Sequence, residues 1–117
     1  MSSAKKIEEL CAACHHGDHR TIKKILRRSP NLVDAHNSNG VTPLVSACLQ
    51  GHAEAVRLLL DGAASINLAE KTHGFAPLHL ACQSGHEGTA RLLLDRGASI
   101  DTSSNDGFTP LSDVLMF

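Results

Sequence analysis

The sequence predicts an all-α fold in which pairs of helices stack along the chain. The first observation is a pentapeptide that recurs three times, as Gly-Val-Thr-Pro-Leu at residues 40–44, Gly-Phe-Ala-Pro-Leu at 74–78 and Gly-Phe-Thr-Pro-Leu at 107–111. The second is that the similarity continues after the first two copies, because Arg-Leu-Leu-Leu-Asp stands at both 57–61 and 91–95. The repeating unit is therefore about 33 residues long, and it holds two apolar segments of helical length.

Proline and glycine mark where the helices of each unit begin and end. Pro43 and Pro77 fit the first turn of a helix, where the missing N–H costs nothing. Gly51 and Gly85 fit the end of that helix, because glycine readily takes the left-handed conformation. We therefore expect first helices over 44–49 and 78–82, second helices over 53–60 and 87–94, and turns near Gly62, Gly97 and residues 101–107.

The composition fits one globular domain, since 42% of the 117 residues are hydrophobic and 20% are charged. No run approaches the ~18 apolar residues of a membrane span. The polar N-terminal residues lack the apolar segment of a secretory signal. We therefore expect a soluble protein of the cytoplasm or the nucleus, with no membrane partner.

A unit of this length that opens with a Gly-x-Thr-Pro-Leu-His-x-Ala type of segment resembles the ankyrin repeat. The resemblance covers nearly the whole chain. Residues 37–70 and 71–103 resemble full repeats, residues 4–36 a divergent capping repeat, and residues 104–117 the opening of another. It implies one ankyrin-type solenoid over residues 1–117, with stacked helix-turn-helix repeats and short β-hairpin-like loops on one side.

Three departures from the family pattern lead to structural expectations. No copy keeps the whole Thr-Pro-Leu-His tetrapeptide, so the family's Thr-to-His side-chain bond should be absent. Ala63 stands where the family usually has a glycine able to take a positive φ, so the helix before it should end one residue sooner. The loop at residues 70–73 carries one extra residue and should be the irregular one.

The resemblance also implies a function, because in that family a concave face of loop tips and first helices binds protein partners. We therefore expect a non-catalytic interaction module: an adaptor, a scaffold or the docking part of a larger protein. The family's variable contact positions fall on the loop residues Ser38, Asn39, Val41, Thr72, His73, Phe75, Asn105, Asp106 and Phe108, and on the first-helix residues His15, His16, Leu49, Gln50, Gln83 and Ser84.

Three of these positions form an apolar series. Val41, Phe75 and Phe108 each follow a loop glycine, and nothing in the core of the repeat requires them. An apolar series inside a polar rim is typical of a protein-binding surface. The alternative is that these side chains pack locally against neighbouring loops.

Cysteine and histidine patterns offer a competing interpretation. Cys11, Cys14 and His15 form a literal Cys-x-x-Cys-His, which attaches haem in some proteins and could also be half of a zinc site. However, Cys14, Cys48 and Cys82 are 34 residues apart, so they occupy one repeat position as small packing residues. We therefore expect no cofactor and no metal, with buried, reduced cysteines of which Cys11 is the most accessible.

Two further histidines, His52 and His86, occupy equivalent positions just after the glycines that end the first helices. We expect their side chains to tie neighbouring units together through hydrogen bonds. His15 and His16 have no such repeat role, and a pH-sensitive contact at them is an open alternative.

Charge is distributed unevenly along the chain. Residues 1–28 hold seven basic and three acidic side chains, and the remainder holds four and nine. The basic residues Arg20, Lys23, Lys24 and Arg27 have the spacing of a solvated helix face. The alternative is a regulatory surface that faces acidic or phosphorylated partners. Nucleic acid is not an expected partner, because the three phenylalanines are the only aromatic residues.

Motifs for catalysis are missing from the sequence. It has no glycine-rich phosphate loop, no His-Glu-x-x-His and no Gly-x-Ser-x-Gly, so we expect no enzymatic activity. The last unit stops after its first helix, at residues 111–117. We expect this end to fray or to self-associate through Leu115, Met116 and Phe117, as in a truncated form or a piece of a longer chain.

Overall fold

The computed structural model describes residues 2–100 and 104–107, and over these ranges the chain is helical and has no strands. The expected C-terminal helix and self-association at residues 111–117, and the expected contact at Phe108, lie outside the described residues. In chain order the helices are α1 Ser3–His16, α2 His19–Arg28, the short 3₁₀ helix η1 Pro30–Leu32, α3 Pro43–Gln50, α4 Ala53–Asp61, α5 Pro77–Gln83 and α6 Glu87–Asp95.

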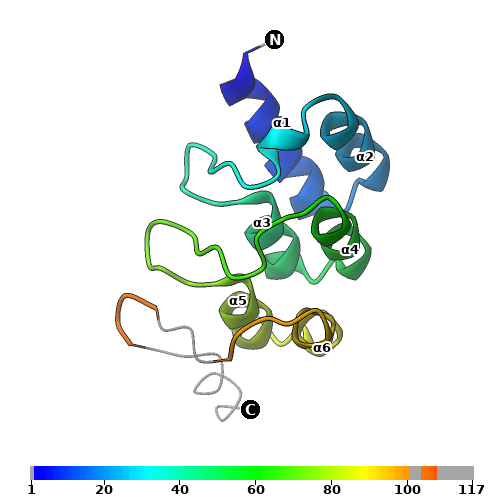
Figure 1. Ribbon diagram of the computed structural model, residues 1–117. Coiled ribbons are helices and arrows are strands. Elements are labelled where there is room, and N and C mark those ends of the chain that lie inside the picture. Colours follow the sequence, from blue (N-terminus) through cyan, green and yellow to red (C-terminus); the bar gives the residue numbers. More distant parts are fainter. Residues whose placement is uncertain (1, 101–103, 108–117) are drawn as a thin grey trace.

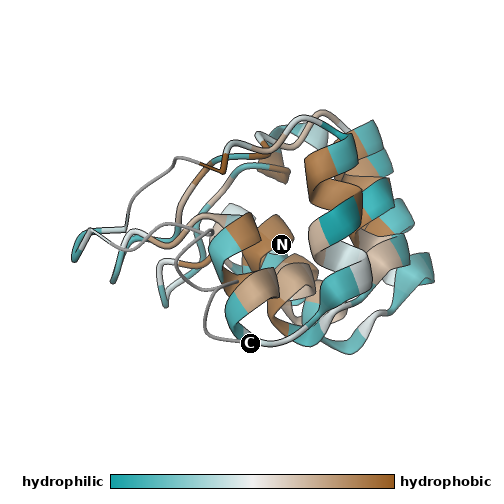
Figure 2. Ribbon diagram, turned by 90° about the horizontal axis from the view of Figure 1, so that it is seen from below, coloured by the Kyte–Doolittle hydropathy of each residue, from teal (hydrophilic) through white to brown (hydrophobic). Residues whose placement is uncertain are grey.

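The helices form three antiparallel pairs that stack in one direction (Figure 1). One layer holds α1, α3 and α5, and the second holds α2, α4 and α6, with contacts between neighbours within each layer and between the two helices of each pair. The connections between pairs all project to the same side, away from the second layer (Figures 1 and 2). The predicted all-α solenoid of helix pairs is confirmed.

The core lies between the two layers, where Figure 2 shows apolar residues gathered on the facing sides of the helices. Leu44 and Leu78 occupy equivalent positions in α3 and α5, and Leu59 and Leu93 do so in α4 and α6. None of these four side chains is more than 2% exposed. All four belong to one continuous cluster of buried residues that extends from α1 to α6, so burial in the core holds the stack together.

Small residues and cysteines pack the inner layer. Ala47 and Cys48 in α3 are fully buried, as are Ala81 in α5 and Cys14 in α1. All four cysteines are buried and reduced, as expected. The expectation that Cys11 is the most accessible is wrong, because Cys11 is 3% exposed and Cys82 is 6% exposed. A hydrogen bond holds the Cys11 thiol inside the fold, since its Sγ donates to the Val41 carbonyl at 3.6 Å.

The inner helices α3 and α5 begin with different capping bonds. At the start of α3 the Thr42 Oγ1 accepts a hydrogen bond from the Val45 N–H at 3.1 Å. Ala76 replaces that threonine before α5, and its own N–H donates to Nδ1 of His79 at 3.2 Å. Each helix thus satisfies one backbone donor of its first turn with a different side chain.

The outer helices α4 and α6 end at the same repeat position, so the expected early end of α4 is wrong. Ala63 takes the left-handed conformation with φ 72°, just as Gly97 does with φ 92°. The reason lies in the backbone hydrogen bonds: Ala64 N–H donates to Leu59 O, and Ala98 N–H donates to Leu93 O. The same turn forms in both repeats, and alanine takes the strained conformation that the turn requires.

Hydrogen bonds recur between successive units in the segments that follow the outer helices. The backbone N–H of Ser65 donates to the Asp34 carboxylate at 2.8 Å. One unit later, Ser99 N–H donates to Oδ1 of Asn67 at 3.0 Å. These bonds join the connection after one outer helix to the connection that follows the next.

Candidate functional site

A hollow of about 340 Å³ lies between the loop at residues 37–41 and the inner helices α1 and α3. It brings together five of the residues expected at a binding face: His15, His16, Asn39, Val41 and Leu49. Its other lining residues are Glu8, Cys11, Ala12, Asn37 and Ser46.

The walls of this hollow, which we call the groove, differ in polarity. Apolar atoms of Ala12, Val41 and Leu49 line part of its surface. The exposed rings of His15 and His16 stand at the C-terminal end of α1, edge to face with centroids 5.1 Å apart. The groove therefore offers apolar surface beside polar side chains that can donate and accept hydrogen bonds.

The loop beside the groove is held in place by two side chains. The Asn37 Oδ1 accepts hydrogen bonds from the N–H groups of Asn39 at 2.9 Å and Val41 at 3.0 Å. The Glu8 carboxylate of α1 accepts from the Ser38 N–H at 2.7 Å and from its hydroxyl at 3.0 Å. The expected contact residue Ser38 is thus tied to α1 and does not line the groove.

The next loop is organised around one buried carboxylate. Glu70 is 8% exposed, and it accepts hydrogen bonds from the N–H groups of Thr72 and His73, both at 2.8 Å, and of Phe75 at 3.0 Å. Burial alone would raise the pKa of Glu70, but these three backbone bonds favour the carboxylate and lower its pKa. Glu70 occupies the position of Asn37, and its longer side chain reaches across the extra residue in this loop.

The two described members of the expected apolar series are half-buried. Val41 lines the groove. The Phe75 ring lies between two imidazoles, with centroid distances of 5.5 Å to His73 and 5.7 Å to His79. Phe75 therefore packs locally and still keeps part of its surface open to solvent.

Neighbouring loops are joined to each other through their backbones. The Lys71 N–H donates to the Gly40 carbonyl at 2.9 Å, and the Asn105 N–H donates to the His73 carbonyl at 2.9 Å. The exposed residues Asn39, Thr72 and Asp106 therefore project from a connected row of loops (Figure 1).

Comparison with known proteins agrees with this architecture. A family model described as ankyrin repeats matches residues 10–106 in three copies. The chain belongs to the ankyrin repeat family. A search of curated proteins found no match to the chain. Ankyrin repeats are generally protein–protein interaction modules and are typically non-catalytic.

The histidines that follow the inner helices fix the wall of the ankyrin groove. The His52 Nε2 donates to the His15 carbonyl at 3.0 Å, and the His86 Nε2 donates to the Leu49 carbonyl at 2.9 Å. This confirms that His52 and His86 tie neighbouring repeats together. Because both acceptors belong to groove residues, these bonds also set where His15 and Leu49 stand.

Several expected contact residues lie outside the groove. Gln50, Gln83 and Ser84 are exposed where α3 and α5 end, and Thr72, His73 and Phe75 belong to the next loop. Conversely, the sequence interpretation missed Glu8 and Ala12. Glu8 lines the groove because α1 has 14 residues where α3 has eight, so the first turns of α1 stand beside the loop. Ala12 is exposed on α1 at the repeat position of Ser46 in α3.

Residues 2–100 and 104–107 contain no group of three or more His, Cys, Asp or Glu side chains that could hold a metal ion. Burial raises the pKa of the Cys11 thiol to about 12, and it raises the pKa of Cys14 and Cys48 as well. Within the described part of the chain, no helix has the length and apolarity to cross a membrane.

Proposed function

We propose that this protein is a non-catalytic interaction module, acting as an adaptor, a scaffold or a docking domain in the cytoplasm or nucleus. Its partner is another protein, which it binds through the groove and the row of loops beside it. The general role of ankyrin repeats supports this class of function. We also propose the repeat boundaries 4–36, 37–70 and 71–103, with a partial repeat at 104–117.

The groove is the observation that carries the proposal. Its lining combines apolar and polar side chains, as protein interfaces do. The wall is prearranged by the hydrogen bond that His52 donates to the His15 carbonyl and by the one that the Glu8 carboxylate accepts from the Ser38 N–H. A prearranged surface loses little conformational freedom when a partner binds.

The proposed centre of binding is Val41 together with Phe75, and Phe108 would extend it to the third loop. Both described members keep part of their side chain open to solvent. The other residues proposed to contact the partner are Ser38, Asn39, Thr72, His73, Asn105, Asp106, His15, His16, Leu49, Gln50, Gln83 and Ser84.

The test fills the groove without disturbing the core. Ala12 is exposed and lines the groove, whereas Ala4 is exposed on the same helix outside it. Proteins captured from a cell extract by the wild type should also be captured by Ala4→Arg and be lost with Ala12→Arg. Equal capture by all three proteins would refute the groove as the binding site.

A second pair of variants tests the proposed centre of binding. Because truncated interface anchors typically cost ~2 kcal/mol or more, Phe75→Ala should weaken partner binding by at least about 30-fold. Leu59→Ala empties a fully buried site and should lower the free energy of unfolding by ~2–5 kcal/mol. If Phe75→Ala destabilises the fold as much as Leu59→Ala, the ring serves the fold and the proposed centre is wrong.

A further inference from the structure

The outer face of α2 carries a concentration of cations without partners. Arg20, Arg27 and Arg28 are exposed, and none lies within 4.0 Å of a carboxylate in the described ranges. The other three arginines all pair with one: Arg57 with Glu54, Arg91 with Glu87 and Arg96 with Asp61. The exposed Lys23 and Lys24 of α2 likewise have no ion-pair partner among residues 2–100 and 104–107.

This arrangement does not serve the stability of α2 itself. Arg20, Lys24 and Arg28 follow one another at i, i+4 spacing, and like charges at that spacing destabilise a helix. The first turn of α2 contains no acidic residue. Arg27 and Arg28 do gain from the helix dipole at the last turn, but Arg20 stands near the opposite end.

Two hollows adjoin this face, and they share Lys24 and Arg28. One of about 370 Å³ follows α2 and is lined entirely by cations: Arg20, Lys23, Lys24, Arg27 and Arg28. The other, of about 310 Å³, lies between α1 and α2 and is lined by Lys6, Glu9, Lys24, Ile25, Arg28 and Ser29.

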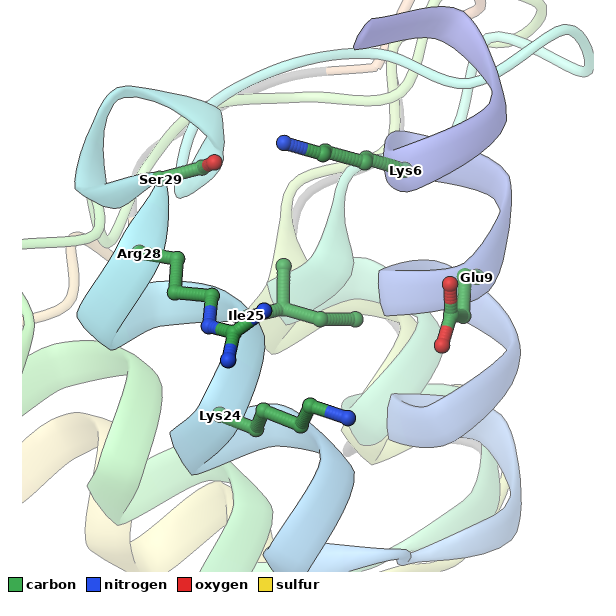
Figure 3. A pocket seen from close by; sticks show the side chains of 6 residues that line it. All are labelled: Lys6, Glu9, Lys24, Ile25, Arg28 and Ser29. Atoms are coloured by element: carbon green, nitrogen blue, oxygen red, sulfur yellow. The ribbon is translucent and has the colours of Figure 1, made fainter. Parts of the chain in front are cut away.

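The second hollow combines charge with an apolar surface. Figure 3 shows Lys6 reaching from α1 toward Ser29, with Ile25 between α1 and the Arg28 side chain. Glu9 is the only acidic lining residue, and it stands across from Lys24 (Figure 3). Three cations therefore outweigh one carboxylate in this hollow.

The surroundings of α2 restrict the size of an anionic occupant. The helices α4 and α6 continue the same layer (Figure 1) and expose Glu54, Asp61, Glu87 and Asp95. Because Arg57, Arg91 and Arg96 pair with three of these four carboxylates, α4 and α6 offer no net positive charge to a nucleic-acid duplex or an anionic membrane laid over α2. In addition, α2 has no Phe, Tyr or Trp side chain on which a base could stack.

We propose that the outer face of α2 is a second docking surface, which binds a short acidic peptide segment of a partner protein. Successive cations at i, i+4 spacing rise about 6 Å along the helix. Alternate side chains of an extended peptide are about 6.6 Å apart. A segment with glutamate or aspartate at every second position can therefore place one carboxylate beside each of Arg20, Lys24 and Arg28.

This surface is distinct from the groove, because α2 lies in the layer away from the loops (Figure 2). The two surfaces can thus be occupied at the same time, and their tests are independent. Interactions with exposed cations are screened by salt, so docking at α2 should weaken as the ionic strength rises.

The experiment measures fluorescence anisotropy of a labelled Gly-Glu-Ser-Glu-Ser-Glu-Gly peptide at low salt. The control peptide has glutamine in place of each glutamate. The test protein combines Arg20→Gln, Lys24→Gln and Arg28→Gln. The matched control combines Arg57→Gln, Lys71→Gln and Arg91→Gln, which removes the same charge from exposed positions on other elements.

The wild type and the matched control should bind the glutamate peptide at least about tenfold more tightly than the test protein does. The glutamine peptide should bind none of them measurably, and thermal unfolding should show that all three proteins are folded. Equal binding of the two peptides, or equal loss in both variants, would overturn the proposal. Tighter binding of a DNA duplex or of phosphatidylserine vesicles than of the peptide would also overturn it.

Discussion

The imidazole ring of His86 lies directly against Gly51, the residue that ends the preceding inner helix. A Cβ atom built at Gly51 would stand 2.5 Å from Nδ1 of that ring. The other ring nitrogen, Nε2, donates to the Leu49 carbonyl two residues earlier. Gly51 also has φ 70°, so two independent constraints require glycine there.

Replacing Gly51 should therefore be costly. In Gly51→Ala the left-handed conformation and the contact with His86 act together, and the free energy of unfolding should fall by at least about 2 kcal/mol. Gly88 is the control, because it lies inside α6 and a Cβ there meets no described atom within 4 Å. Gly88→Ala should raise stability by about 0.5–1 kcal/mol. Chemical denaturation of both variants measures the difference, and equal effects would contradict the contact.

Replacing the strained Ala63 should have the opposite effect on stability. Ala63 has φ 72°, which costs an ordinary residue roughly 1–2 kcal/mol relative to glycine. Because glycine also loses more freedom on folding, Ala63→Gly should stabilise the protein by about 0.5–1 kcal/mol. The measurement is the denaturation midpoint at an unchanged slope. A destabilised Ala63→Gly variant would mean that this turn does not adopt the left-handed conformation.

The buried carboxylate of Glu70 should make stability depend on pH. Its pKa is lower in the folded than in the unfolded protein, so its contribution is complete above about pH 4.3, the ordinary pKa of glutamate. That contribution is lost as the pH falls through the folded-state pKa. At pH 7, Glu70→Gln should lower the free energy of unfolding by about 1–2 kcal/mol.

The control for this variant is Glu54→Gln, because Glu54 is exposed on α4. It should change stability by less than about 0.5 kcal/mol. The difference in the free energy of unfolding between the wild type and Glu70→Gln should disappear in acid, when unfolding is measured from pH 7 to pH 3. A gap that stays constant over this range would show that the carboxylate charge does not stabilise the loop.

The cysteines should react slowly in the folded protein. All four are buried, and burial raises the pKa of Cys11 to about 12, so at pH 8 its reactive thiolate is scarce. At most one thiol per chain should react quickly with a disulfide reagent at pH 8, and all four should react in denaturant. Rapid native labelling of three or four thiols would contradict this packing.

The fold could be predicted from the sequence because the residues that mark helix starts and ends recur in each unit. The helices expected at 44–49 and 78–82 are α3 and α5, since Pro43 and Pro77 open both helices as expected. The prediction that the helix before Ala63 ends one residue sooner is wrong, because α4 ends at Asp61 just as α6 ends at Asp95. The energy that alanine loses at a positive φ is smaller than the energy that packing gains from forming the same turn after both outer helices.

The site was harder to predict, because its details depend on contacts between distant residues. A charged residue in a loop, such as Glu70, is ordinarily exposed, and only the folded loop brings three N–H groups around it. Likewise, Ser38 faces Glu8 across 30 residues of sequence. A pattern of neighbouring residues in the sequence cannot reveal a contact between residues that are so far apart in the chain.

The bonds between units recur with the period of the sequence. Asp34 binds Ser65 as Asn67 binds Ser99, and His52 and His86 reach equivalent carbonyls. Each of these four bonds joins one unit to the next. A duplicated segment covering residues 37–70 would therefore find the partners for these two kinds of bond already in place. Such a chain can lengthen or shorten by whole units in evolution and keep these bonds between its units.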